Sequence, residues 1–394
     1  MDSGNDKRVA AARRRIKALD QQTIADMLAI VQIPAPPFGE DKRAAFVAEQ
    51  LRALELAVEV DEVGNVTAAS SGAADLPPII VAAHLDTVFP ADTSIEVRRN
   101  GGRIHAPGIA DNSRGLAAML AMARVLKDQQ LRTRRRILFV ATVGEEGVGD
   151  LRGVKHLFRP GSELRAAAAF ISLDGSGRRR IVYRAIGSRR FRVTISGPGG
   201  HSWADWGTAN PVHALGSAIG GIEQIEVPKQ PRSALTVARI GGGTSVNAVP
   251  AEAWCEVDLR SESGTVVVDL EAALRRNIES AIDHANARRK RGTAALKVDI
   301  RLIGDRPSGE TPVNSALVRA ARAATRAFGD TPELVASSTD ANIPISLGVP
   351  AIALGAGGES GGTHTKEEWY SNEGGPEGIE RALMVVLEMA EIEE

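Results

Sequence analysis

Apolar residues along this chain change their spacing from one segment to the next. Residues 21–33 and 41–54 have the pattern of helices, and a proline-rich stretch ends the first of them. The run 79–83 is apolar throughout, as in a strand buried on both faces of a sheet. Two similar runs follow, at 137–143 and 170–173. Strands that alternate with helices in this way predict an α/β fold with a parallel or mixed sheet.

A further helix is predicted directly after the segment 111–113. Leu116, Leu120 and Ala123 recur at helical spacing, which places them on one face. Polar residues precede this helix and could cap its amino terminus.

The pattern changes near Gly187. Residues 190–195 alternate apolar and polar, as in a strand with one exposed face, and other strand-like and helix-like segments follow. Further along the chain the alternation of helices with buried strands returns. We therefore expect a larger discontinuous domain, at 1–186 and 301–394, with a smaller α+β domain inserted at 187–300, which is a common domain size.

Composition narrows the class of protein. The chain has 394 residues, 48 basic and 49 acidic, so net charge gives no reason to expect nucleic acid or a membrane surface as partner. No apolar run approaches the roughly 20 residues that span a bilayer. Residues 1–20 are polar and arginine-rich, unlike a secretory signal, so we expect a cytoplasmic protein.

The single cysteine, Cys255, lies in an alternating run and is expected in the core rather than as a catalytic thiol.

Five short segments concentrate side chains that bind metal ions, and most of them follow a predicted strand, where α/β folds build their sites. The candidates are His84, Asp86, Asp111, Glu145, Glu146, Asp174 and His364. Some have plain structural alternatives: Asp111 could cap a helix, Asp174 could be a turn residue, and His364 could be an exposed loop histidine. Together they offer two imidazoles and several carboxylates, which suit zinc, manganese or cobalt. A carboxylate shared between two ions is the usual two-metal arrangement.

The adjacent pair Glu145 and Glu146 stands between glycines at the end of a predicted strand, a position that is hard to explain structurally. Neighbouring side chains diverge there, so one glutamate can bind metal while the other acts as general base. Asp86 follows His84 by two residues and could fix the tautomer of its imidazole, as histidine ligands usually require.

These residues and their order resemble the M20 metallopeptidases, a family that includes carboxypeptidase G, peptidase T, cytosolic dipeptidases, acetylornithine deacetylase and succinyl-diaminopimelate desuccinylase. The resemblance rests on the motifs 84–88, 108–112 and 144–147 and on the late His364, and it spans nearly the whole chain. It implies a zinc-exopeptidase-like catalytic domain, with a mixed sheet between helices, and an inserted lid domain that carries dimerisation. It also implies two divalent metal ions, with zinc favoured over manganese or cobalt.

The resemblance assigns the metal ligands as well. It implies that His84 and Asp174 bind one ion, and that Glu146 and His364 bind the other. Asp111 would bridge the two ions.

Other roles are implied by the same resemblance. Asp86 would support its neighbouring histidine, and Glu145 would be the general base. In the lid, His201 matches the histidine that stabilises the oxyanion, often from the partner subunit, although a surface histidine in a turn is the plain alternative. Asn247 matches an asparagine that contacts substrate, and Arg260 matches an arginine that binds a substrate carboxylate.

Three functions remain open. The first is a two-metal exopeptidase, of the aminopeptidase or dipeptidase kind, acting on small peptides; Asp174 favours it because family deacylases tend to carry glutamate there. The second is an N-acyl-amino-acid amidohydrolase with the same metal core. The third is a non-enzymatic metal-binding protein, which the presence of Glu145 disfavours. We expect a homodimer formed through the lid, whose Trp203 and Trp206 either contact substrate or pack under the lid.

Overall fold

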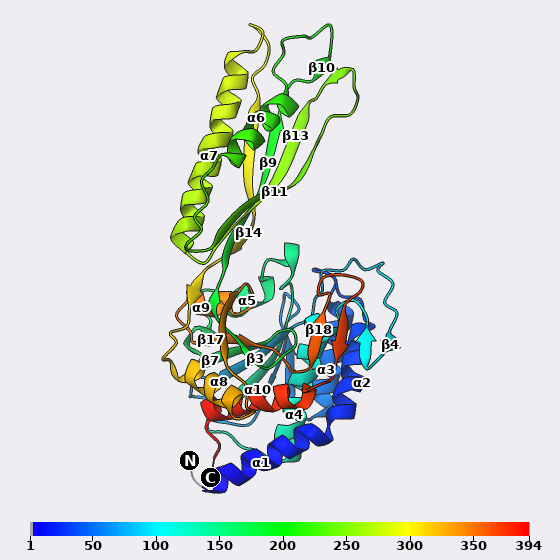
Figure 1. Ribbon diagram of the computed structural model, residues 1–394, viewed down its shortest axis with the longest axis vertical. Coiled ribbons are helices and arrows are strands. Elements are labelled where there is room, and N and C mark those ends of the chain that lie inside the picture. Colours follow the sequence, from blue (N-terminus) through cyan, green and yellow to red (C-terminus); the bar gives the residue numbers. More distant parts are fainter. Residues whose placement is uncertain (1–2, 394) are drawn as a thin grey trace. The chain divides into compact units, whose positions relative to one another are not determined.

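The computed structural model describes residues 3–393 and divides into two compact units (Figure 1). One unit is residues 186–309, and the other combines the described residues on either side of it. The expected insert ended at residue 300, whereas strand β14 (Lys297–Arg306) continues beyond that point. Residues 1, 2 and 394, which the sequence assigned to the larger domain, lie outside the described residues. None of the described helices is long and apolar enough to cross a lipid bilayer.

The larger unit is built on one mixed sheet, whose neighbouring strands follow the order β1-β2-β6-β3-β7-β17-β8-β15, with β16 paired to β8. The strands are β1 (Ala57–Val60), β2 (Val66–Ala69), β3 (Ile79–His84), β6 (Ile137–Thr142), β7 (Ala169–Leu173), β8 (Arg180–Ala185), β15 (Gly309–Glu310), β16 (Glu333–Ser337) and β17 (Ala351–Leu354). The central pairs β6–β3, β3–β7 and β7–β17 are parallel, while β1–β2, β2–β6 and β17–β8 are antiparallel. The predicted α/β class with a mixed sheet is confirmed.

Both faces of the central strands are buried, as the continuous apolar runs predicted. Along β3, Val81 belongs to the core on one face and Ile80 to the core on the other. Helices with residues in the first core are α1 (Ser3–Ala18), α2 (Asp20–Val31), α3 (Asp41–Ala53), α4 (Gly115–Asp128), α8 (Ala316–Arg326) and α10 (Gly375–Ala390). Those in the second core are α5 (Arg152–Leu157) and α9 (Asn342–Ser346).

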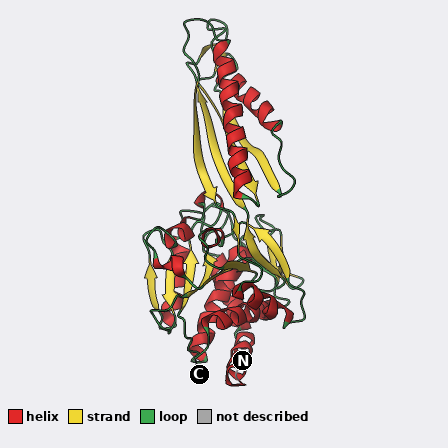
Figure 2. Ribbon diagram, turned by 90° about the vertical axis from the view of Figure 1, so that its left-hand side faces the viewer, coloured by secondary structure: helices red, strands yellow, loops and turns green. Residues whose placement is uncertain are grey.

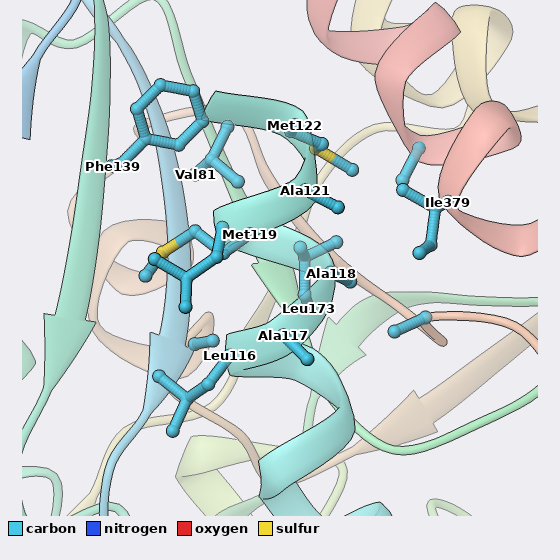
Figure 3. Packing of buried hydrophobic residues seen from close by; sticks show 14 of the residues in the cluster. Val81, Leu116, Ala117, Ala118, Met119, Ala121, Met122, Phe139, Leu173 and Ile379 are labelled. Atoms are coloured by element: carbon cyan, nitrogen blue, oxygen red, sulfur yellow. The ribbon is translucent and has the colours of Figure 1, made fainter. Parts of the chain in front are cut away.

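Helix α4 is buried on more than the single face that its apolar spacing suggested. Nearly every residue from its start to Leu126 is buried. Figure 3 shows the helix with Val81 and Phe139 of the sheet on one side and Ile379 of α10 on the other. The helix therefore fixes the turn that precedes it against the rigid interior of the unit.

Helix α1 lies in a stretch that the sequence showed only as polar and arginine-rich. Its residues Ala12 and Ile16 are buried. Arg13 pairs with the buried Glu380 of α10, with 2.8 Å between Nε and Oε2. The helix was missed because its arginines, which hide the apolar pattern, serve as ion-pair partners for the rest of the unit.

A second sheet of the larger unit carries a loop that becomes important below. Its strands, in the order β18-β19-β5-β4, are antiparallel. They are β4 (Arg98–Asn100), β5 (Arg103–His105), β18 (Glu359–Gly361) and β19 (Trp369–Ser371). The loop 362–368 joins β18 to β19 and contains His364.

The smaller unit is an antiparallel sheet with two helices on one face (Figure 2). Its sheet has the order β11-β13-β9-β14, and a separate short pair joins β10 to β12. The elements besides β14 are β9 (Gly187–Ser196), β10 (Gly200–His201), α6 (Pro211–Glu223), β11 (Ser233–Gly242), β12 (Ala248–Val249), β13 (Glu252–Ser261) and α7 (Gly264–Ala287). Burial alternates along β13, so one face packs against α6 and α7 and the other is partly exposed.

Cys255 lies on the buried face of β13, in the core shared with α6 and α7, as the sequence predicted. Burial raises the pKa of its thiol to about 11, because the charged thiolate would lose its hydration there. The residue is therefore a packing side chain.

We expect native Cys255 to react with iodoacetamide at pH 8 roughly 100-fold more slowly than the same thiol in unfolded protein. A pKa of about 11 leaves about one hundredth of the thiolate that an ordinary value of 9.0 provides at that pH, and burial slows access further. Mass spectrometry of alkylated protein, with and without denaturant, measures the two rates. Equal rates would show an accessible thiol instead.

Candidate metal centre

Three of the candidate segments meet because parallel strands end at the same edge of the large sheet. His84 is the last residue of β3, which pairs in parallel with β6 and β7. Glu145 and Glu146 follow the end of β6, and Asp174 follows β7 directly. The expectation that strand-end residues gather at one place is met for these four side chains.

Asp111 and His364 reach the same place from outside the large sheet. Asp111 lies in the turn Ile109–Arg114 that precedes α4, and His364 lies in the loop between β18 and β19. Asp111 Oδ1 is 3.0 Å from His84 Nε2, and Asp111 Oδ2 is 3.1 Å from His364 Nε2. His364 Nε2 is also 3.0 Å from Glu146 Oε1. One carboxylate thus lies between two imidazoles.

The side chains fall into overlapping groups whose potential ligand atoms lie within 4.8 Å of one another. One group is His84, Asp111 and Asp174, and another is Asp111, Glu146 and His364. Asp111 belongs to both. Glu145 forms a third group with His84 and Glu146, so its carboxyl group lies beside the other two.

The side-chain nitrogen and oxygen atoms are better arranged to bind a cation than to form hydrogen bonds with one another. His84 Nδ1 lies 3.0 Å from the backbone oxygen of Asp86, which can only accept, so Nδ1 carries the hydrogen. In the neutral ring Nε2 then presents a lone pair to Asp111 Oδ1. Within the described chain this oxygen is buried and has no hydrogen-bond partner. Two facing lone pairs repel unless a proton or a metal ion lies between them, so the site has the donor chemistry of a metal centre.

The pKa values of these side chains also indicate a place that favours positive charge. Hydrogen bonds to Asp111 and Glu146 raise the pKa of His364 to about 10. Burial and the nearby charge of Asp111 raise the pKa of Asp174 to about 7. Burial opposes charge on His84 too, yet its contacts with Asp111 and Asp86 hold its pKa well above the ordinary value. The crowded carboxylates therefore favour positive charge at this place, which either protons on the imidazoles or a metal ion between the donor atoms can supply.

Asp86 contacts His84 differently from the expectation. Its backbone oxygen makes the 3.0 Å contact, whereas its carboxylate Oδ1 is 3.6 Å from Nδ1. The carboxylate accepts the backbone N–H groups of Glu145, at 2.9 Å, and Glu146, at 2.7 Å. Asp86 therefore fixes the turn that carries the two glutamates as well as the imidazole.

The alternative of a helix cap does not describe the carboxylate of Asp111. Asn112 performs that task, because its side-chain oxygen accepts the backbone N–H of Gly115, the first residue of α4, at 3.1 Å. Asn112 also donates to the backbone oxygen of Leu173 at 2.8 Å. This second bond ties the turn to the end of β7, next to Asp174.

Sequence reasoning missed the residue that holds the Asp111 turn. Buried Glu368 accepts the backbone N–H groups of Gly108, Ala110 and Asp111, at 2.9, 2.8 and 3.0 Å. Burial raises the pKa of Glu368 to about 7, although these three bonds stabilise its charge. The only signal was an acidic residue beside Trp369, four positions after His364.

Three further predicted residues lie in the smaller unit. His201 and Asn247 are exposed on neighbouring segments, because β10 pairs with β12 and Ser202 N–H donates to the backbone oxygen of Asn247 at 3.0 Å. Arg260 stands near the other end of β13, where its Nε donates to Asp258 at 2.6 Å. The structure thus brings His201 and Asn247 together and keeps Arg260 apart from them within this unit.

A mixed sheet with histidine and carboxylate donors converging at its strand ends defines an α/β protein with a candidate metal centre. The chain belongs to the peptidase family M20/M25/M40, whose model matches residues 80–391. The resemblance to M20 metallopeptidases is confirmed, and the protein is a hydrolase of a family that binds divalent metal ions.

Individual relatives are similar at modest identity. The [LysW]-lysine hydrolase of Deinococcus radiodurans is 26% identical over 86% of this chain and 89% of its own length. A tripeptidase structure from Staphylococcus aureus has a TM-score of 0.76 and 24% identity, covering 94% of this chain and 98% of that one. A dinuclear metal-binding M20 peptidase from Bacillus subtilis has a TM-score of 0.68 and 17% identity, covering 95% and 99%. These structures share the fold.

Proposed function

We propose that this protein is a two-metal exopeptidase that hydrolyses the amide bond of di- or tripeptides. The observation that carries the proposal is the carboxylate of Asp111, whose two oxygens face His84 and His364 at 3.0 and 3.1 Å. Asp174 would complete the group around His84, and Glu146 the group around His364. Zinc suits these donors, and manganese or cobalt would also fit. The Bacillus subtilis neighbour is described as dinuclear, which agrees with this assignment.

Glu145 is the general base in this proposal. When bound, the two ions would polarise the scissile carbonyl and make water more acidic. The Glu145 carboxylate would take the proton from the attacking water and return it to the leaving amine. Its backbone N–H donates to Asp86 at 2.9 Å, which holds in place the turn that carries the base.

His201 is suited to donate a hydrogen bond to the developing oxyanion. Its Nδ1 accepts the backbone N–H groups of Trp203, at 3.2 Å, and Ala204, at 3.4 Å. A nitrogen that accepts carries no hydrogen in the neutral ring, so Nε2 bears the N–H. The exposed Nε2–H is then available to a substrate.

His201 and Arg260 lie far apart along the smaller unit. His201 pairs with Ala248, just before β13 begins at Glu252, and Arg260 lies eight residues further along that strand, or roughly 27 Å at strand spacing. An extended tripeptide spans at most about 11 Å. This separation favours a site to which two chains contribute, as in the expected homodimer.

We predict that His201→Ala lowers kcat by about 10²–10³-fold, because a donor aimed at the oxyanion acts mainly in the transition state. Metal content and KM should change little. Steady-state kinetics and metal analysis of the purified variant measure all three. A wild-type kcat would remove His201 from the reaction.

Mixing two inactive variants tests where His201 acts. If it crosses the dimer, Glu145→Ala mixed with His201→Ala forms dimers with one intact site, and random pairing restores about one quarter of wild-type activity. Subunit exchange is verified with differently tagged chains. Exchange without recovered activity would place His201 within its own chain or outside the reaction.

The second candidate function is hydrolysis of N-acyl amino acids. It is favoured by the Deinococcus relative, which is named a [LysW]-lysine hydrolase rather than a peptidase. The tripeptidase neighbour and the aspartate at position 174 favour the peptidase. The two functions differ in whether the preferred substrate has a free amino group.

A matched substrate panel separates them. Di- and tripeptides are compared with the same peptides carrying an N-acetyl group, and with N-acetyl amino acids, each with added zinc, manganese or cobalt. The proposed exopeptidase prefers the free amine by at least about tenfold in kcat/KM. Preference for the acetylated compounds would establish the amidohydrolase, and no turnover of any compound would contradict both.

A further inference from the structure

A cavity in the smaller unit shares no lining residue with the candidate metal centre. Its volume is about 440 Å³, within the roughly 300–1,000 Å³ range of small-molecule sites. It lies between α6 and α7, and the loop residue Trp206 forms part of its wall. Every residue that lines it belongs to 186–309, whereas the proposed metal ligands belong to the larger unit.

Two arginines give the lining of this cavity a positive charge. Arg288 and Arg289 line it from the end of α7, and His213 and His284 line it from the two helices. None of the described residues that line it is an aspartate or glutamate. Elsewhere in the smaller unit arginines are paired with acids on the exposed sheet face, as in Arg192 with Glu256. The absence of carboxylates from the lining favours an anionic occupant.

Backbone contacts hold two parts of the wall in position. Arg289 donates to the backbone oxygens of Asn286, at 2.7 Å, and Thr293, at 3.1 Å. Lys290 N–H donates to the backbone oxygen of Gly207 at 2.7 Å, which ties the Trp206 loop to the end of α7. The guanidinium and the indole therefore belong to two segments that a backbone hydrogen bond joins.

Trp206 is 79% exposed, which is unusual for so large an aromatic side chain. A tryptophan face beside guanidinium groups offers stacking to a planar ring and charge to a phosphate. The polar side chains of Thr208, Asn210 and Ser217 also line the cavity and offer hydrogen bonds to hydroxyl groups.

We propose that this cavity binds a small anion that carries an aromatic ring, of the nucleoside monophosphate class. Trp206 stacks on the base, and Arg288 and Arg289 bind the phosphate. A site of this volume holds one small molecule rather than a stretch of polymer. The proposal does not depend on the reaction at the metal centre.

Isothermal titration calorimetry of the full-length, metal-loaded protein with AMP tests the proposal. We expect saturable binding of AMP. Binding of adenosine and of inorganic phosphate should be at least tenfold weaker, because adenosine lacks the phosphate and inorganic phosphate lacks the aromatic ring. Absence of AMP binding at millimolar concentration overturns the proposal. Phosphate binding as tight as that of AMP also overturns it, since the aromatic wall would then contribute nothing.

The chain supplies matched controls for the site. Trp206→Ala and the double variant Arg288→Gln with Arg289→Gln should each weaken AMP binding at least tenfold. Trp203→Ala and Arg291→Gln change residues that are also exposed but do not line the cavity, and should leave binding unchanged. Equal effects in both sets overturn the assignment to this cavity.

One competing location is the metal centre, because phosphate oxygens also bind divalent cations. His364→Ala should retain AMP affinity if the cavity is the site. Loss of AMP binding in His364→Ala, with normal binding in Trp206→Ala, overturns the proposal in favour of the metal centre. Thermal unfolding of each variant confirms that the comparison is made on folded protein.

Discussion

The Asp111→Ala protein is expected to lose metal from both positions at once. The carboxylate contributes one oxygen to the group around His84 and the other to the group around His364. Removing it leaves each group with fewer donors and exposes crowded carboxylates to one another. Changes to residues behind a ligand already cost about 10–100-fold in metal affinity, so we expect more than about 100-fold here. Turnover should fall by at least about 10²–10⁴-fold, since the base then lacks an activated water.

Mass-spectrometric metal analysis after equilibration with zinc buffers measures this loss. His364→Ala is the matched comparison, because that side chain belongs to only one of the two Asp111 groups and should weaken mainly one ion. Asp61→Ala controls for the loss of an aspartate, since Asp61 accepts backbone N–H groups in a turn of the same unit. Two tightly bound equivalents in Asp111→Ala would refute the bridging role.

The Glu145→Ala protein is expected to keep both ions and lose about 10²–10⁴-fold in kcat. Its neighbour provides the contrast. Glu146 lies 3.0 Å from His364 Nε2 and is proposed as a ligand, so Glu146→Ala should lose one ion as well as activity. Both side chains are buried at the same turn, and both backbone N–H groups are held by Asp86. A comparison of the Glu145→Ala and Glu146→Ala proteins therefore distinguishes the loss of a general base from the loss of a metal ligand, in nearly the same local structure.

Pre-steady-state and steady-state rates on the best peptide substrate, together with metal stoichiometry, distinguish the outcomes. Glu145→Gln keeps the shape of the side chain but cannot take a proton, and should resemble Glu145→Ala. Wild-type turnover in either variant would contradict the base assignment. Loss of metal in Glu145→Ala would mean that this residue is a ligand rather than the base.

The parts of the site that follow strands could be predicted from the sequence. A continuous apolar run identifies a central strand, and the residue after it must lie at the edge of the sheet, as His84 and Asp174 do. The inserted unit was recognisable for a similar reason, because strands exposed on one face alternate in polarity, as β9 and β13 do.

Contacts between distant segments could not be predicted in this way. Glu368 stabilises the Asp111 turn through backbone N–H groups, which carry no side-chain signal in the sequence. Helix α1 was hidden because its arginines pair with acids such as Glu380. The separation of His201 from Arg260 depends on the length and direction of β13, which a motif comparison does not contain.

The position of the 362–368 loop has a consequence for how the protein is made. His364 and Glu368 contact Asp111 across 253 and 257 residues of sequence. A nascent chain that has emerged only as far as the smaller unit therefore has Asp111 without its second imidazole and without the glutamate that holds its turn. Contacts so distant form late, since the loop they close is long. The proposed metal centre can therefore form only after residues 364–368 have been synthesised, and fragments that end before residue 364 are expected to lack the proposed second ion and peptidase activity.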